Sequence, residues 1–325
     1  MGAKAVAAAV AFSLLAHLQI VLAQGTAEVE TILYKAADAL GMLRTPREVD
    51  RVATMIFSGT GTLTLDSEVC VMEHYRAGIR YPIPNARHTF PVPGMRVDFS
   101  CAREDDEQER HIHVVAGDLA WDETEPGLNA TPAPETVRER LLQVWILPQG
   151  LVKAAAVAGP LVTASTEAGN PVLTFPLPAP LDDTVVKVTL DPEVFLSHTM
   201  PTGLKREFSH RITRVETRFD GVVMEVTYAN YQDWNHADYK SDVLLPGRIV
   251  HRLGGTTTLE LTLTHSNTYN PYVVMPVPEN IPRAASGAVG RRNGGSCYSP
   301  AILRLTPRSR GGVQRCIVTY GQWPF

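Results

Sequence analysis

The chain has 325 residues and a formal net charge of −4, and hydrophobic residues make up 44% of it. This length and composition are enough for one large or two ordinary globular domains with a substantial core. Seven of the 30 Lys and Arg residues lie in 280–325, which contains no carboxylate, so residues 1–279 keep 23 basic against 34 acidic side chains and a net charge near −11. Such an acidic body is a poor partner for nucleic acid, and we expect none to bind.

Residues 1–23 have the pattern of a signal peptide. An almost purely apolar run ends with Val21 and Ala23, the small-residue positions of a signal-peptidase site. A signal anchor is the competing interpretation, but His17 and Gln19 interrupt the run, and a spanning helix needs ~20 predominantly apolar residues. No later segment is apolar enough to span a bilayer. The sequence therefore predicts an exported protein, periplasmic or extracellular, with no stable membrane span.

The next part of the sequence predicts one helix followed by strands. Residues 24–51 carry apolar side chains at helical spacing, with Gly41 as a natural stop. Alternating apolar residues then predict strands at 54–65, 94–101 and 109–123, and two glycines in the first of them favour a bend or bulge. The charged stretch between the last two strands is expected to form a solvated hairpin tip.

A change of period at 134–159 predicts a second helical region. It breaks at Pro148, so we expect two helices, which together can cover one face of a sheet. Arg and Glu residues are expected on the side of the first helix that faces away from the sheet. The apolar stripe of that helix consists of Val137, Leu141, Leu142, Val144 and Trp145.

Strand patterns then follow one another at short intervals up to His265. The predicted strands are 171–177, 184–191, 209–219, 222–231, 241–253 and 256–265. In the last of them, leucines alternate with Glu and Thr, which predicts an antiparallel sheet with a single covered face. The turns at 219–221 and 254–255 are typical of hairpins, so the aromatic residues between 228 and 265 are expected to form cross-strand pairs on adjacent strands.

Several of these segments together resemble a known family. They are a helix ending in LGM, a GTGT strand, RERLLQVWILPQGLVKAA at 138–155, and the strands from ITRVETRF to the MPVPENI that ends at Ile281. They are similar to the non-catalytic amino-terminal region of exported metallo-β-lactamase-fold hydrolases. The last part also resembles lipoprotein-carrier-like half-barrels. The resemblance implies an α+β domain over 24–283, in which a curved antiparallel β-sheet, a half-barrel, packs on helices.

The sequence departs from that family after this domain. In the longer relatives a zinc-binding hydrolase domain with an H-x-H-x-D-H run follows. Here residues 284–325 follow instead, with Gly, Ser and Pro between arginines and no sustained hydrophobic period. Our hypothesis is that 284–325 is a truncated or frame-shifted terminus, largely disordered.

Two short stretches contain metal-ligating residue types. His111 and His113 stand two apart on a predicted strand, so they share a face and could hold Zn²⁺ together. The residues after them lack the Asp-His that the hydrolase motif requires, and we interpret the two as a structural pair on a polar face. Asp233, His236 and Asp238 offer ligand types at loop spacing, but a hairpin connection explains them equally well. We assign no catalytic, metal-binding or cofactor-binding residue.

The four cysteines leave the disulfide pairing open. Cys70 and Cys101 lie in the body of the chain, and Cys297 and Cys316 lie near its end. Both pairs could oxidise in an exported protein, but spacing does not reveal connectivity.

A curved sheet closed on one side by helices could leave an apolar cleft. Its expected lining is Trp145, Phe175, Tyr228 and Trp234, and the alternative is that these rings only fill the core. The first functional hypothesis is an exported, non-enzymatic binding or accessory domain for an apolar small molecule or lipid. The second is an incomplete or partner-dependent member of a zinc hydrolase system, with a hydrolase partner chain. A structural remnant without activity is the third.

Overall fold

The computed structural model describes residues 27–43, 52–65, 68–82, 92–102, 108–199, 203 and 205–282. The predicted signal peptide, the predicted tail and the second cysteine pair lie outside these residues.

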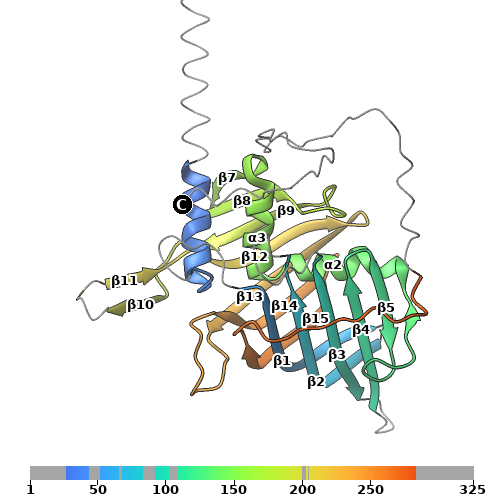
Figure 1. Ribbon diagram of the computed structural model, residues 1–325. Helices are drawn as coiled ribbons and strands as arrows, with labels where there is room; N and C mark the ends of the chain where they lie inside the picture. The colour runs from blue at the N-terminus through green and yellow to red at the C-terminus, as the bar shows by residue number, and fades with distance from the viewer. Residues whose placement is uncertain are drawn as a thin grey trace, which may run out of the picture.

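Thirteen strands within the described residues form one curved, open, antiparallel sheet (Figure 1). Their order is β6-β5-β4-β3-β2-β1-β15-β14-β13-β12-β9-β8-β7, and β10 and β11 form a separate hairpin. The predicted α+β class with a curved antiparallel sheet is confirmed. The strands are β1 Thr54–Leu65, β2 Glu68–Arg80, β3 Gly94–Ala102, β4 Gln108–Ala116, β5 Leu119–Glu123, β6 Thr131–Pro132, β7 Thr163–Glu167, β8 Asn170–Pro176, β9 Val185–Asp191, β10 Leu196–Thr199, β11 Lys205–Phe208, β12 Arg211–Phe219, β13 Val222–Gln232, β14 Leu245–Leu253 and β15 Thr256–Asn267.

The six strands predicted between 171 and 265 are confirmed as β8, β9 and β12 to β15, whereas the hairpin of β10 and β11 was not predicted. β13, β14 and β15 are neighbours in the sheet, so the aromatic stretch from 228 to 265 is indeed built of adjacent strands. Asp220 and Gly221 both have positive φ, as the turn between β12 and β13 requires. β1 pairs with β15, which joins the first and last strands of the described residues in the middle of the sheet.

Among the described residues, three helices pack on one face of the sheet, here called the helix face. Residues 27–39 are helical and end just before Gly41, whose φ is +68°. α2 covers Val137–Trp145 and α3 covers Pro148–Ala158, so the predicted break at Pro148 is confirmed. Short 3-10 turns at Pro134–Thr136 and Gly159–Leu161 flank the pair.

The predicted apolar stripe of α2 is buried, but its Arg140 corrects the expectation that the charged residues point away from the sheet. Arg140 is only 6% exposed. Its guanidinium donates to the carbonyls of Val114 and Trp121 at 3.1 and 2.9 Å and to Asp122 at 2.6 Å. One acceptor on β4 and two on β5 therefore hold a cation where the helical pattern alone predicts an exposed one.

The sheet is also covered on part of its second face, which corrects the expectation of a single covered side. Residues 271–282, here called the strap, run across β1 to β5 (Figure 1). The strap packs its Val273, Met275 and Ile281 against a second apolar cluster that contains Ile112 and Trp121. We call this side of the sheet the strap face.

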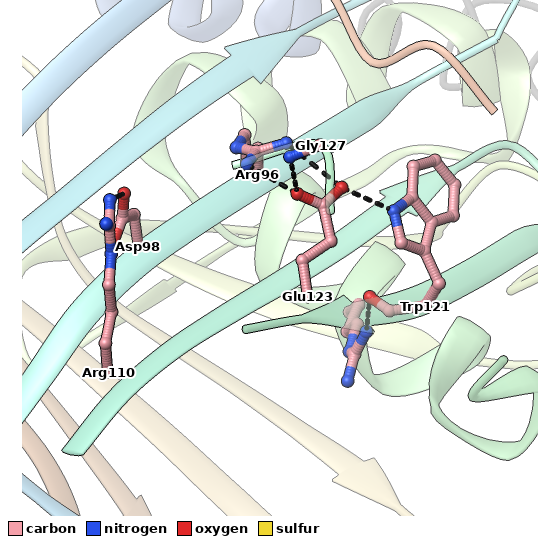
Figure 2. A network of polar contacts seen from close by, with 7 residues as sticks. Arg96, Asp98, Arg110, Trp121, Glu123 and Gly127 are labelled. Atoms are coloured by element: carbon pink, nitrogen blue, oxygen red, sulfur yellow. Dashed lines mark hydrogen bonds and ion pairs between the residues drawn. The ribbon is translucent and has the colours of Figure 1, made fainter. Parts of the chain in front are cut away.

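A buried carboxylate on the strap face, beside that cluster, accepts hydrogen bonds from several donors (Figure 2). Glu123 is 4% exposed and accepts two hydrogen bonds from Arg96, at 3.2 and 2.7 Å. It also accepts from the Trp121 indole at 2.8 Å and from the Gly127 backbone at 2.5 Å. Burial alone raises the pKa of Glu123, but the hydrogen bonds from Gly127, Trp121 and Arg96 outweigh burial and lower it.

The disulfide pairing left open by the sequence is settled for one pair. Cys70 on β2 and Cys101 on β3 form a disulfide on the helix face, with a Cα–Cα distance of 5.1 Å.

Candidate functional site on the helix face

A small, wholly apolar space lies where the helices meet the sheet. Its roughly 200 Å³ of non-atom space includes the gaps between packed side chains and open solvent, so the free space itself is no larger than a water molecule. The helix at 27–39, α3 and the strands β8, β9 and β12 enclose it. Its lining residues are Leu33, Ala36, Leu151, Val152, Ala155, Leu173, Phe175, Val188, Leu190 and Ile212. No polar side chain lines this space, but it is too small to be a ligand pocket by itself.

A strip of apolar side chains continues along the helix face and is only half-buried. It crosses five strands that are neighbours in the sheet, β12, β13, β14, β15 and β1. Nearer the helices the same face is fully buried, as Leu261 and Val226 show. Leu63 lies directly opposite Leu259, and Met224 lies opposite Leu253, which is 38% exposed. This apolar strip consists of Leu63, Leu65, Phe219, Met224, Leu253 and Leu259.

His251 lies within the apolar strip. It stands on β14 between Leu259 on one side and Val226 on the other. Burial among these neighbours lowers the pKa of His251 to about 4, so its imidazole is neutral at pH 7. A neutral ring leaves the strip without a charge and still offers one hydrogen-bond donor and one acceptor.

Of the four predicted lining residues, Phe175 is the one that lines the small apolar space. Trp145 and Tyr228 are buried in the core. The Tyr228 hydroxyl donates to the Ile146 carbonyl, which ties the bend between α2 and α3 to the sheet. Trp234 is half-buried, and its indole donates to the Leu245 carbonyl at 3.1 Å.

His111 and His113 lie on the helix face, which corrects the expectation of a pair on a polar face. Their rings contact Phe99, with centroid distances of 5.0 and 5.3 Å. Burial and, to a smaller extent, Arg140 lower the pKa of His113 to about 4, although Asp122 acts in the opposite direction. Across the part of the chain that the structure describes, no group of three or more His, Cys, Asp or Glu side chains is arranged to hold a metal ion.

The stretch 233–239 forms part of the connection between β13 and β14, as the hairpin interpretation predicts. Asp233 turns inward and accepts the Ser241 backbone N–H at 2.7 Å. His236 and Asp238 point outward, with side chains 69% and 78% exposed and a distance of 3.4 Å between Nδ1 and Oδ2. The three candidate ligands therefore do not converge on one point.

Sequence reasoning missed most of the apolar strip. Leu259 is one of the alternating leucines that predict an apolar strand face, but alternation does not reveal which end of a strand the helices leave uncovered. Among the described residues, no single helix is both long and apolar enough for a membrane crossing. Pro134–Trp145 and Pro148–Leu161 satisfy length and composition only together, and they meet at a bend of 97°.

Comparisons with known proteins add a distant structural likeness. No family model matches the chain, and no curated protein matches it. Among solved structures, the crystal structure of a LolA superfamily protein from Nitrosomonas europaea is similar, with a TM-score of 0.37 and 9% sequence identity. The match covers 75% of this chain and 93% of that one. The expected link to metallo-β-lactamase-fold hydrolases stays a prediction.

Proposed function

We propose that this protein is a non-enzymatic binding protein that holds an apolar ligand, such as one alkyl chain of a lipid, on the helix face of its sheet. The observation that supports the proposal is the apolar strip, six side chains that share one face of five neighbouring strands and remain half-buried or exposed. Contiguous apolar surface of this kind marks binding sites more often than isolated exposed residues do.

The chemistry of the strip fits an aliphatic chain. Its side chains are leucines, one methionine and one phenylalanine, and methionine adapts its shape to irregular partners. Each CH₂ group that such a ligand removes from water contributes about 0.8 kcal/mol. The neutral His251 imidazole is the polar group within the strip, and it can accept or donate one hydrogen bond to the ligand's polar end.

Binding of a fluorescent naphthylamine probe, with displacement by fatty acids of increasing length, tests this function. Leu259→Glu places a charge in the strip, and we expect it to weaken probe binding at least tenfold. Thr262→Glu is the matched control, because Thr262 lies on the same strand, is exposed and faces the opposite side of the sheet. Equal affinity in both variants, both shown to be folded by circular dichroism, would refute the proposed site.

The predicted signal peptide makes export part of the proposal. The mass of the protein purified from an exported fraction tests it, and we expect the mature chain to begin at Gln24. A mass that includes residues 1–23 would contradict cleavage.

A further inference from the structure

The connection between β13 and β14 is held by an internal hydrogen-bond network. Asn235 is 6% exposed and donates to Ser241 Oγ at 2.8 Å and to Thr268 Oγ1 at 2.7 Å. In return, the Thr268 backbone donates to Asn235 Oδ1 at 3.0 Å. The Asp233 carboxylate accepts the backbone N–H groups of Asn235, Ser241 and Asp242 at 2.9, 2.7 and 2.8 Å. The backbone of this connection is therefore held in place before any partner arrives.

This fixed connection presents aromatic rings to the solvent. Tyr239 is 68% exposed, and Tyr269, on the segment after β15, is 56% exposed. The Tyr269 hydroxyl donates to the Lys240 carbonyl, which places its ring next to the residue that follows Tyr239. The His236 ring lies 6.3 Å from the Tyr239 ring. We call His236, Tyr239 and Tyr269 the aromatic platform.

The groups around the platform are polar and carry negative charge. Asp238 is exposed, whereas the Lys240 ammonium is engaged with the carbonyls of Asp233 and Asn235 at 2.6 and 2.7 Å. Large apolar side chains exposed at this site are tyrosines, unlike the leucines of the apolar strip. A protein interface normally surrounds its aromatic residues with further apolar contact, so the mixture of rings and carboxylates here fits a ligand rich in hydroxyl groups better.

We propose that the aromatic platform binds a neutral polysaccharide. The C–H bonds on the flat face of a sugar ring are attracted to the negative face of a tyrosine ring. Asp238 and the His236 imidazole can exchange hydrogen bonds with the sugar hydroxyls, and exposed carboxylates disfavour an anionic polymer. The fixed backbone of the connection lowers the entropic cost of binding. Tyrosine side chains add little to this cost, because each has few torsions to immobilise.

The platform is distinct from the apolar strip. It lies beyond Leu245, where β14 begins, whereas Leu253 of the strip lies at the other end of that strand. Occupation of the two sites can therefore be measured independently, and the failure of one proposal does not imply the failure of the other.

Affinity electrophoresis tests the proposal, with gels cast without polymer, with hydroxyethyl cellulose, with a soluble mannan or with anionic alginate. We expect retardation of the unmodified chain in at least one neutral polymer. Tyr239→Ala should reduce the apparent association constant about tenfold, the loss of one well-placed aromatic contact. Tyr239→Phe keeps the ring and should bind like the unmodified chain. Leu128→Ser, at an exposed leucine beyond β5, is the control for a general change in surface apolarity.

Three results would overturn the proposal. The first is normal migration of the unmodified chain in both neutral polymers. The second is equal retardation of the Tyr239→Ala variant and the unmodified chain. The third is retardation by alginate alone, which would indicate binding of anionic polymers and contradict the expected role of the carboxylates.

Discussion

Replacement of Glu123 by Gln is expected to destabilise the protein by about 2–3 kcal/mol at pH 7. Glutamine keeps the length of the side chain but removes the charge. Its amide NH₂ replaces one carboxylate oxygen, so two N–H donors would face the N–H donors that this oxygen now accepts from. Two of the four hydrogen bonds are lost, and Arg96 loses its counter-charge. The Arg96 side chain is 22% exposed, so water recovers part of the loss and keeps the figure below that of a fully buried ion pair.

Urea unfolding of the two proteins at a series of pH values measures this effect. Because the folded-state pKa of Glu123 is lowered, its contribution is fully present above the unfolded-state value of ~4.3 and disappears as the pH falls through the folded-state pKa. Asp98→Asn is the matched control on the same face, because its ion pair with Arg110 is more exposed and should contribute less than about 1 kcal/mol. Equal losses for the two variants, or a loss that does not change with pH, would refute the reasoning.

Three further predictions concern other parts of the fold. Reduction of Cys70–Cys101, which spans 31 residues, should lower the free energy of unfolding by about 3–4 kcal/mol, and an unchanged urea midpoint in dithiothreitol would contradict it. The pKa of His251 is about 4 in the folded state and ~6.5 when unfolded, so stability should fall by about 3 kcal/mol as the pH drops between these values. His251→Leu should lose less, and equal losses in both proteins would exclude this role. A Cβ at Gly247 would lie 2.5 Å from Cζ2 of Trp234, so Gly247→Ala should cost about 1–3 kcal/mol, and an unchanged melting temperature would show that the indole moves freely.

Local chemistry made the strands and helices of the helix face predictable. Alternation identified β12 to β15 because one side of each strand is apolar, and the turn residues at 219–221 and 254–255 marked the two tight hairpins. Pro148 marked the bend because a proline is accepted in the first turn of a helix but not in its interior.

Features that depend on contacts distant in sequence were not predictable in this way. The strap has four prolines in twelve residues and no regular period, so the sequence pattern does not predict that its apolar side chains are buried. Their burial depends on the apolar cluster that contains Trp121. Arg140 is buried because two carbonyls and Asp122 from other elements surround it. The apolar strip belongs to the same class, since its exposure depends on where α2 and α3 end over the sheet.

The pairing of β1 with β15 determines when the sheet can be completed. Ile56 pairs with Asn267, so this contact closes a loop of about 200 residues, and loop closure over such a distance is slow compared with the formation of a hairpin. Until residue 267 is available, β1 has one partner strand instead of two, and the two halves of the sheet remain separate. If the chain crosses a membrane before it folds, β1 and β15 therefore cannot pair until almost all of the described residues have crossed.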